Sequence, residues 1–391
     1  MPSVKSWDVI IIGGGIIGLS LAIVLRKRGA TVLIVERGEP GREASHAAGG
    51  MLVDSPLETL PALQPLAAAS THMYPEFAHE LEVESGMKVD LRDYGTIFFW
   101  SGKQSGQFSL LDPQFRKCSL SVLDLEESEP ALKYGDFDNE QELESFRQEF
   151  ETPPSPEDFR NFCKSVFRPA MLLSERCVDP RSLTTAALKT ARNRGADFSS
   201  GDPVTTVNLS DGRAVGVTTT KTTFLAEKVV NCAGAWSGQI PPHTFPTRPV
   251  KGQMLYLAMP TRTLLKHVIR SPQVYLIPRS DGRLLVGTTV EEAGFDKRTD
   301  PATIQRLYRA ALQLVPKLAD ARILEDWAGL RPGTPDALPI LGATSTPGYY
   351  VATGHFRDGI MLAPITAQVM SAVLEGRDPE YDLSSFSPAR F

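Results

Sequence analysis

Apolar and polar positions at the start of the chain predict a strand, a helix and a second strand in close succession. A short apolar run over 9–12 ends at three consecutive glycines, and a further glycine follows at Gly18. Apolar residues then recur at helical spacing over 19–25, and a second β-rich run over 31–35 closes on Glu36. This order of strand, glycine turn, helix and strand is typical of a unit that binds a dinucleotide.

The glycines of this unit have separate expected roles. Gly13 permits the tight turn, and Gly15 lets the backbone approach a pyrophosphate, whose charge is favoured at a helix N-terminus. Gly18 allows the helix to pack closely on the strand, and Glu36 is expected to accept hydrogen bonds from the adenosine ribose. The alternative for each glycine is turn geometry alone. Proteins that bind NAD also begin this way, so the unit by itself does not choose between NAD and FAD.

The rest of the pattern predicts two interleaved domains. Helices are expected over 63–85, 180–194, 302–318 and 361–374, and strands over 95–100, 203–209, 214–220, 226–231, 252–257, 273–278, 283–287 and 349–352. Units of βα type therefore lie at both ends of the chain, with antiparallel strands between them. We predict an α/β (α+β) fold with a discontinuous Rossmann-type domain (1–80, 171–235 and 325–391) and an antiparallel-sheet substrate domain (81–170 and 236–324).

Composition and charge narrow the function classes. The 391 residues are 42% hydrophobic and 22% charged, which is typical of a globular protein with a sizeable core. A net charge of −5 gives no basic footprint for nucleic acid, and no histidine or cysteine spacing typical of a metal site occurs. The acidic, proline-containing stretch 135–160 is interpreted as a solvated excursion, the alternative being a partner-binding segment or an active-site lid.

The cysteines and the first apolar run bear on the compartment. Cys118, Cys163, Cys177 and Cys232 are widely spaced, as expected for reduced, buried thiols. Glycines interrupt the run over 9–25, so a strand, turn and helix explain it better than a membrane segment, and no basic leader precedes it. We therefore expect a cytoplasmic protein without an integral membrane segment.

Seven blocks of sequence together resemble the FAD-dependent amino-acid oxidase family (the D-amino acid oxidase superfamily), and within it the glycine oxidases. They are IIGGGIIGLSLA, ASHAAGGML, ERCVDPRSL, VVNCAGAWS, VYLIPR, WAGLRPGTPDALPILG and GHFRDGIMLAP, of which the last two are the most specific. The resemblance implies a glutathione-reductase-like FAD fold of the amino-acid oxidase type. It also implies non-covalent FAD, because no cysteine follows Cys232.

The resemblance further implies which residues contact FAD. Residues 47–51 would lie under the isoalloxazine, and Val204 would pair its main chain with the adenine. Residues 233–234 would approach the pyrophosphate half, and 354–361 would place a helix N-terminus near the flavin pyrimidine. The full expected set is Gly13, Gly15, Ile16, Ile17, Gly18, Glu36, Arg37, Ser45, His46, Ala48, Gly49, Gly50, Met51, Val204, Ala233, Gly234, Trp236, His355, Phe356, Arg357, Asp358, Gly359, Ile360 and Met361.

Two residues are expected to hold the substrate and to serve catalysis. Arg331 would bind a substrate carboxylate through a two-pronged guanidinium pair, and its alternative is a structural arginine. Tyr275 alternates with apolar residues and would donate a hydroxyl to the same carboxylate, the alternative being a half-buried strand tyrosine. The expected substrate-binding set is completed by Met51, Gln273 and Arg357.

Some positions depart from the family pattern or stay ambiguous. Glycine oxidases have histidine where this chain has Gln273 and methionine where it has Val290, and both are expected at the side-chain end of the pocket. Preference for glycine over a larger D-amino acid is therefore open. Arg357 contacts flavin or substrate, or it pairs with Asp358. His355 is expected to be a packed or flavin-shell residue and not a general base.

We predict an FAD-dependent oxidase of glycine, sarcosine or small D-amino acids. The Cα hydrogen would leave as hydride to flavin N5, giving an imine and then a 2-oxo acid, and molecular oxygen would yield hydrogen peroxide. Three alternatives remain, namely a dehydrogenase that passes electrons to a quinone, a non-catalytic FAD subunit, and a hydroxy-acid oxidoreductase. The sequence does not decide the oligomeric state, and a homo-oligomer is one alternative. A glycine oxidase would fit a role in supplying a precursor of thiamine.

Overall fold

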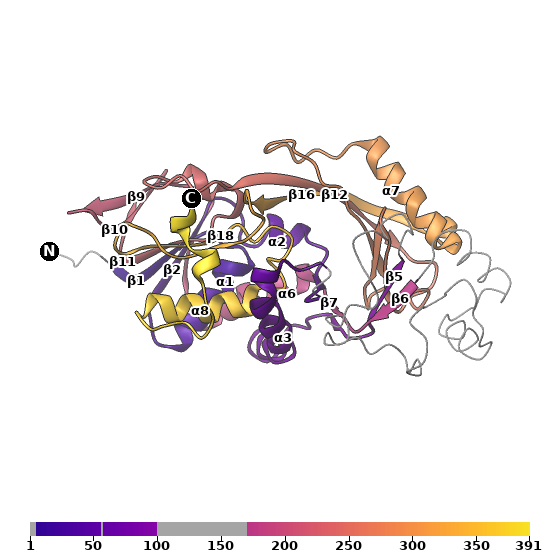
Figure 1. Ribbon diagram of the computed structural model, residues 1–391, viewed down its shortest axis with the longest axis horizontal. Helices are drawn as coiled ribbons and strands as arrows, with labels where there is room; N and C mark the ends of the chain where they lie inside the picture. The colour runs from indigo at the N-terminus through magenta and orange to yellow at the C-terminus, as the bar shows by residue number, and fades with distance from the viewer. Residues whose placement is uncertain (1–4, 56–57, 100–169) are drawn as a thin grey trace.

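The computed structural model describes residues 5–55, 58–99 and 170–391 and contains two large sheets joined by long strands (Figure 1). The acidic stretch 135–160, together with Cys118 and Cys163, lies outside the described residues. Cys177 and Cys232 are buried free thiols, as expected.

The first sheet has eight strands, and β1 lies at its centre, parallel to both of its neighbours. Its main path runs β17-β18-β11-β1-β2-β8, and the hairpin β9–β10 joins it at β11. The strands are β1 (Ser6–Ile12), β2 (Val32–Glu36), β8 (Asp197–Ser200), β9 (Val204–Ser210), β10 (Arg213–Thr219), β11 (Thr223–Asn231), β17 (Ile340–Ala343) and β18 (Tyr349–Thr353). The predicted hairpin is confirmed, and its turn holds Asp211 and Gly212 at positive φ.

Both faces of this sheet are covered, which explains the nearly continuous apolar runs of its strands. Val9 and Ile11 of β1 pack against helices, whereas Ile10 and Ile12 face the side of the β9–β10 hairpin. The helices on the first face are α1 (Ile16–Lys27), α3 (Gln64–Ser85), α6 (Pro180–Asn193) and α8 (Ala363–Leu374), which contact one another (Figure 1). The layers thus form the predicted Rossmann-type unit.

The second sheet has seven strands in the order β16-β12-β15-β14-β13-β5-β6. They are β5 (Thr96–Phe99), β6 (Ala170–Leu173), β12 (Arg248–Ala258), β13 (Val268–Arg270), β14 (Tyr275–Pro278), β15 (Arg283–Gly287) and β16 (Arg322–Gly333). Leu276 and Leu255 pack on the face that carries α7 (Pro301–Leu314), whereas Ile277 and Met254 face the opposite way. Figure 1 shows β12 and β16 running from beside the first sheet toward α7.

Short elements connect the two sheets. A three-stranded sheet has the order β3-β7-β4, with β3 (Met51–Leu52), β4 (Leu91–Arg92) and β7 (Arg176–Val178), and α2 (Ala44–Ala47) precedes β3. The 3₁₀ helices are η1 (Pro61–Leu63), η4 (Gly234–Gln239), η5 (Pro316–Asp320), η6 (Ser384–Phe386) and η7 (Pro388–Arg390). The helix predicted over 302–318 ends at Leu314, and Pro316 begins η5 because proline cannot continue the α-helical hydrogen bonding.

Strand β16 is the main difference from the sequence-based prediction, which places a domain boundary at residue 325. It pairs with β12 from Arg322 to Gly333, so the seven-stranded sheet extends past that boundary. Residues 322–326 are all exposed, and an exposed strand carries no apolar alternation by which a sequence pattern could reveal it. The division into domains stays a prediction.

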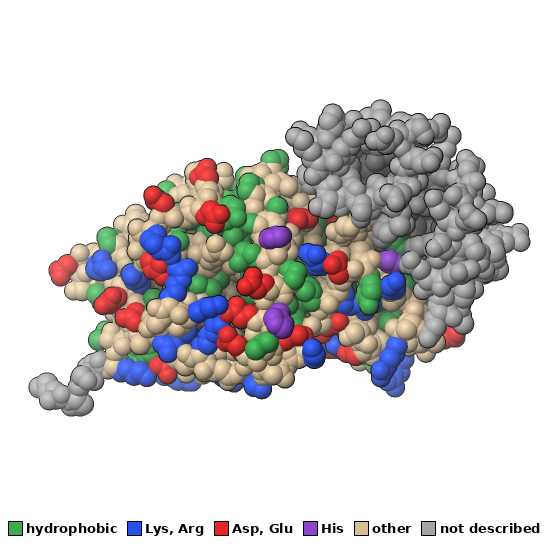
Figure 2. All heavy atoms as spheres, turned by 90° about the horizontal axis from the view of Figure 1, so that it is seen from below, with side chains coloured by type: hydrophobic (Ala, Val, Ile, Leu, Met, Phe, Trp, Pro, Cys, Tyr) green, Lys and Arg blue, Asp and Glu red, His purple; other side chains and the backbone are tan. Residues whose placement is uncertain are grey.

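The surface completes the description of the fold. On the face seen in Figure 2, acidic and basic side chains are interspersed across the described part of the chain. None of the helices formed by the described residues is long and apolar enough to cross a membrane.

Candidate active site

A cavity of about 610 Å³ lies where the glycine turn of the first sheet meets the face of the second sheet opposite α7. It brings together most of the residues that the sequence predicts for cofactor and substrate. The predicted residues that line it are Gly13, Gly15, Ile16, Ile17, Glu36, Arg37, Ser45, Ala48, Gly49, Gly50, Met51, Val204, Ala233, Gly234, Trp236, Tyr275, Arg331, His355, Phe356, Arg357, Asp358, Gly359 and Ile360.

Four predicted residues do not line this cavity. Gly18 lies behind the turn, and its missing side chain lets α1 approach the backbone of Gly13. Met361 is buried, with its carbonyl accepting a hydrogen bond from Ser70, and His46 is half-buried in α2. Gln273 is exposed in the turn before β14.

Val290, expected beside Gln273 at the side-chain end of the pocket, is 63% exposed. The two positions that depart from the glycine oxidase pattern are therefore not brought to the cavity wall.

The glycine turn after β1 provides the anion-binding end of the cavity. Gly13 has φ +107°, and a Cβ added there would lie 2.5 Å from the carbonyl oxygen of Cys232. Helix α1 begins at Ile16, and its N-cap residue, Gly15, has no side chain with which to cap the helix. The Ile16 N–H donates instead to the Ser45 hydroxyl at 2.9 Å. Gly15, Ile16 and Ile17 line the cavity, so the start of this helix lies where its N–H groups suit a pyrophosphate.

The adenosine end of the expected cofactor site is held by Glu36 and Arg37. The buried Glu36 carboxylate accepts hydrogen bonds from the N–H groups of Gly14 (2.7 Å) and Gly38 (2.9 Å). The turn therefore fixes this carboxylate at the cavity wall. The guanidinium of Arg37 lies 4.2 Å above the ring of Trp236, which forms another part of the wall.

The opposite end of the cavity has a floor of small residues. Gly50 has φ +82°, and an added Cβ would overlap the carbonyl oxygen of Val178. At Gly49, an added Cβ would lie 3.1 Å from the Tyr275 hydroxyl. Gly49 and Gly50 thus line the cavity with backbone and no side chains, which fits the approach of a flat ring such as the isoalloxazine half of FAD.

Arg331 carries a positive charge into the cavity from β16. Its guanidinium donates to the Thr289 carbonyl at 3.2 Å and to the Thr288 hydroxyl at 2.9 Å, both of which are neutral groups. Burial lowers the pKa of Arg331, and the neighbouring Arg357 acts in the same direction, but an arginine stays protonated at any physiological pH. A mostly buried guanidinium that faces a cavity and has only neutral hydrogen-bond partners among the described residues is suited to bind a carboxylate.

Tyr275 of β14 reaches toward Arg331 of β16 across the two strands between them, β15 and β12. Gly287 of β15 stands between Met254 of β12 and Tyr275 of β14, so the tyrosine ring passes over a residue without a side chain. The Tyr275 hydroxyl lies 3.5 Å from the sulfur of Met254. Burial raises the pKa of Tyr275, which Arg331 opposes, so the hydroxyl stays protonated and can donate.

The sequence-based prediction missed the residues that support this pair. Gly252 of β12 lies opposite Gly329 of β16. A Cβ added to Gly252 would overlap the Arg331 guanidinium. Thr288 and Thr289 then orient that guanidinium from the end of β15. A glycine within a strand pattern signals close approach of another group, and this signal at Gly252 could have identified its role.

We predict that Gly252→Ala raises the KM for the amino-acid substrate that the sequence leads us to expect by about tenfold, which corresponds to about 1.4 kcal/mol of binding free energy. The added methyl group displaces the flexible end of Arg331 and not the backbone, so FAD content and the melting temperature should stay close to those of the unaltered protein. Steady-state kinetics by oxygen consumption measures KM. An unchanged KM would show that Arg331 does not need the space above Gly252.

The loop after β18 contributes Arg357 and Asp358 to the cavity wall. Burial raises the pKa of Asp358 to about 6, with Arg357 opposing the shift and Glu58 adding to it. His355 is buried, and its Nε2 lies 3.1 Å from the Thr366 hydroxyl. Burial lowers the pKa of His355 to about 3, so it is neutral and packed at physiological pH.

The raised pKa of Asp358 makes a stability prediction with a defined sign. A free aspartate has a pKa near 3.8, so raising it to about 6 in the folded state favours the protonated form. The stability that the protonated Asp358 carboxyl contributes is fully present below about pH 4 and is lost as the pH rises through about 6. Asp358→Asn, which cannot ionise, should show a smaller fall in melting temperature over this interval. If the melting temperatures of the two proteins fell equally between pH 4 and pH 6, the raised pKa of Asp358 would be refuted.

Cys232 lines the cavity near the glycine turn. Burial raises the pKa of its thiol to about 12, so the thiol stays protonated and is a poor nucleophile. Groups of three or more residues able to hold a metal ion do not occur in the part of the chain that the structure describes.

Comparison with known proteins agrees with the geometry. The model of the family described as FAD dependent oxidoreductase matches residues 8–373. The chain belongs to this family. Its cofactor is therefore FAD, and the mixed α/β architecture described above is that of the family.

Individual relatives of this FAD-dependent oxidoreductase cover nearly the whole chain. This chain is 32% identical to the glycine oxidase of Pseudomonas aeruginosa, and the match covers 97% of this chain and 98% of that protein. It is 32% identical to the bifunctional protein ThiO/ThiG of Trichormus variabilis, of whose length it spans 55%. The crystal structure of glycine oxidase from Geobacillus kaustophilus matches with a TM-score of 0.83 and 28% identity over 99% of both chains.

Proposed function

We propose that this protein oxidises small α-amino acids, with the substrate carboxylate bound by Arg331 and Tyr275. The observation that carries the proposal is the mostly buried Arg331 guanidinium, which faces the cavity and, within the part of the chain that the structure describes, donates to neutral groups only. A carboxylate would complete its hydrogen bonds and neutralise its charge. The similarity to proteins named glycine oxidase supports an amino-acid substrate.

The chain's residues act mainly by alignment. Arg331 of β16 offers two parallel donors, and the protonated Tyr275 hydroxyl adds a third from β14, across β12 and β15. Together they fix the carboxylate and so restrict the position of Cα relative to the small-residue floor formed by Gly49 and Gly50. When bound above that floor, FAD supplies the acceptor for the hydride that leaves Cα. No side chain of the cavity is assigned as a proton acceptor, because the free amine can be selected from solution.

The proposed substrates are glycine, sarcosine and small D-amino acids such as D-alanine. Tyr275, Met51 and Met254 narrow the space next to the carboxylate site, which favours short side chains. Because one methyl group changes discrimination by only about 1–3 kcal/mol, overlapping substrates are expected. The products would be an imine, which hydrolyses to a 2-oxo acid, and hydrogen peroxide formed from molecular oxygen.

A peroxide assay with glycine, sarcosine, D-alanine, D-proline and L-alanine tests this proposal. We expect turnover of glycine, sarcosine and D-alanine and none of L-alanine. Rapid turnover of L-alanine would overturn the binding pose. The same panel without oxygen and with a soluble quinone distinguishes an oxidase from a dehydrogenase, since a dehydrogenase turns over only when the quinone is present. A role in thiamine precursor supply and non-covalent attachment of FAD stay predictions.

A further inference from the structure

Arg279 is a fully buried arginine that holds the floor of the cavity from behind. It follows β14 directly and has 0% of its surface exposed. Its Nη2 donates to the Gly49 carbonyl at 2.6 Å, its Nη1 to the Val178 carbonyl at 3.0 Å, and its Nε to the Tyr256 hydroxyl at 3.4 Å. The guanidinium thus joins the small-residue floor, strand β7 and strand β12 at one point.

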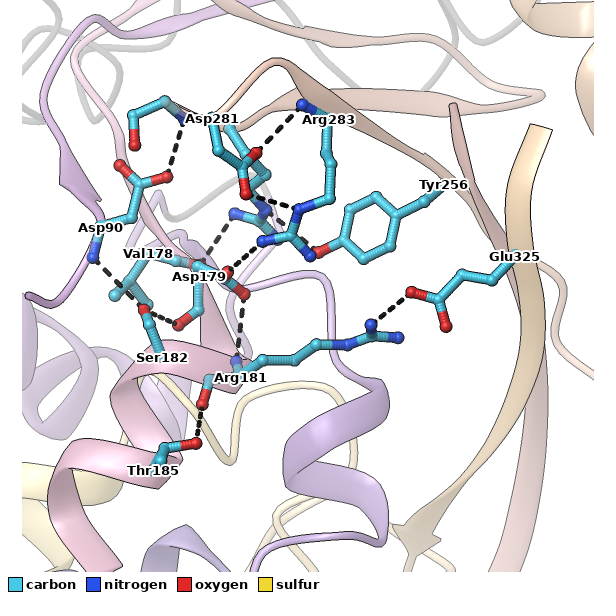
Figure 3. Close-up of polar contacts among 12 residues, drawn as sticks. Asp90, Val178, Asp179, Arg181, Ser182, Thr185, Tyr256, Asp281, Arg283 and Glu325 are labelled. Carbon is cyan, nitrogen blue, oxygen red and sulfur yellow. Dashed lines mark hydrogen bonds and ion pairs between the residues drawn. The ribbon is translucent and has the colours of Figure 1, made fainter. Parts of the chain in front are cut away.

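Among the described residues the acceptors of Arg279 are all neutral, although a carboxylate lies nearby. Asp179 accepts from Arg283 at 3.0 Å and from the Arg181 N–H at the start of α6, as Figure 3 shows, and its carboxylate is therefore already used. Burial by itself lowers the pKa of Arg279, but Tyr256, Asp179 and Cys177 outweigh it and the net shift is upward. The side chain accordingly keeps its positive charge beneath the cavity floor.

The contact with Gly49 determines the direction of a peptide group. In a trans peptide the carbonyl and the following N–H point in opposite directions, so a Gly49 carbonyl turned toward Arg279 leaves the Gly50 N–H turned away from it. The Gly50 carbonyl is held separately by the Val178 N–H at 2.8 Å. Both Gly49 and Gly50 line the cavity, and their backbone is free to rotate except where these contacts fix it.

We propose that Arg279 is a positioning residue for the flavin. Its two-pronged contact with Gly49 and Val178 holds the Gly49–Gly50 peptide with its N–H available to the flavin, and its unpaired charge stabilises the electron-rich reduced ring. The proposal rests on the FAD cofactor of the family and not on the identity of the amino-acid substrate. It can therefore fail while the proposed substrate chemistry holds, and the reverse also applies.

Two substitutions separate the contact from the charge. Arg279→Met removes both, and we expect it to weaken FAD binding at least tenfold and to disfavour flavin reduction by about tenfold, or about 30 mV for a two-electron couple. Arg279→Lys keeps the charge, but one ammonium cannot reproduce the fork that reaches both carbonyls. It should weaken FAD binding while leaving the reduction potential close to that of the unaltered protein.

The measurements need no substrate. FAD affinity comes from fluorescence titration of the apoprotein, and the potential comes from equilibration with a reference dye. Arg194→Met is the matched control, because Arg194 also donates to a backbone carbonyl, that of Ile23 at 2.9 Å, but pairs with Glu80 and Glu84 away from the cavity. It should lower the melting temperature without changing FAD affinity or potential.

The outcomes that overturn the proposal are also defined. Arg279→Met with unchanged affinity and potential would exclude both roles. If Arg279→Met does not fold, Arg279→Lys decides alone, since an affinity for FAD equal to that of the unaltered protein would exclude the positioning role. A control that changes affinity and potential as much as Arg279→Met would show a general loss of stability instead of a local effect.

Discussion

Arg331→Met should abolish most turnover while leaving FAD bound. The substitution keeps an apolar chain of similar length in β16 but removes the charge that faces the cavity between Thr288 and Thr289. Removing one partner of a buried charged pair costs about 3–5 kcal/mol, which corresponds to a decrease of at least about 10²-fold in kcat/KM at 1.4 kcal/mol per factor of ten. The measurement is kcat/KM for glycine together with the ratio of flavin to protein absorbance.

Two comparisons sharpen this result. Arg331→Lys keeps the charge without the planar fork and should retain an intermediate activity. Binding of acetate, which has a carboxylate but no amine, should be lost in Arg331→Met if the residue acts on the carboxylate. Undiminished kcat/KM in Arg331→Met would move the carboxylate site to another part of the cavity, with Arg357 as the next candidate.

Gly13→Ala is the second large effect, and it should yield a protein that is purified without FAD. The residue has φ +107°, a conformation that costs an alanine about 1–3 kcal/mol. In addition, the methyl group would lie 2.5 Å from the Cys232 carbonyl oxygen, which belongs to the backbone and cannot move aside cheaply. The turn must therefore open, and the N–H groups at the start of α1 lose the alignment that suits a pyrophosphate.

Gly29→Ala is the matched control for this substitution. Gly29 also has a positive φ, +88°, but an added Cβ would meet nothing within 4 Å. The control therefore measures the conformational cost alone, and it should bind FAD normally with a somewhat lower melting temperature. If Gly13→Ala retains stoichiometric FAD, the tight turn is not what positions the cofactor.

The sequence predicts those parts of the molecule whose signals are local. The glycine turn, Glu36 and helix α1 lie within one short segment, and the strand and helix around them are confirmed. Helix α6 is likewise predicted with its N-cap, because Asp179 accepts from the Arg181 N–H and Pro180 follows directly. Such features depend on neighbours within a few residues, which a single sequence displays.

Other parts depend on partners that are distant in sequence. Gly252 matters because it faces Arg331 on another strand, and Arg279 matters because it reaches Gly49, 230 residues away in the chain. Gln273 shows the converse, since a resemblance in sequence assigned it to the pocket whereas the turn before β14 leaves it exposed. Cross-strand pairing and loop direction decide these placements, and neither leaves a periodic signal in the sequence.

Anaerobic mixing of the FAD-loaded protein with glycine tests the central claim most directly, because it isolates the transfer of the Cα hydrogen from every later step. We predict that the visible absorbance of oxidised flavin disappears at a rate that saturates with glycine concentration, that acetate competes, and that Arg331→Met shows no such loss at the same concentrations. Flavin that stays oxidised with glycine, sarcosine and D-alanine, while dithionite reduces it fully, would contradict the proposed function.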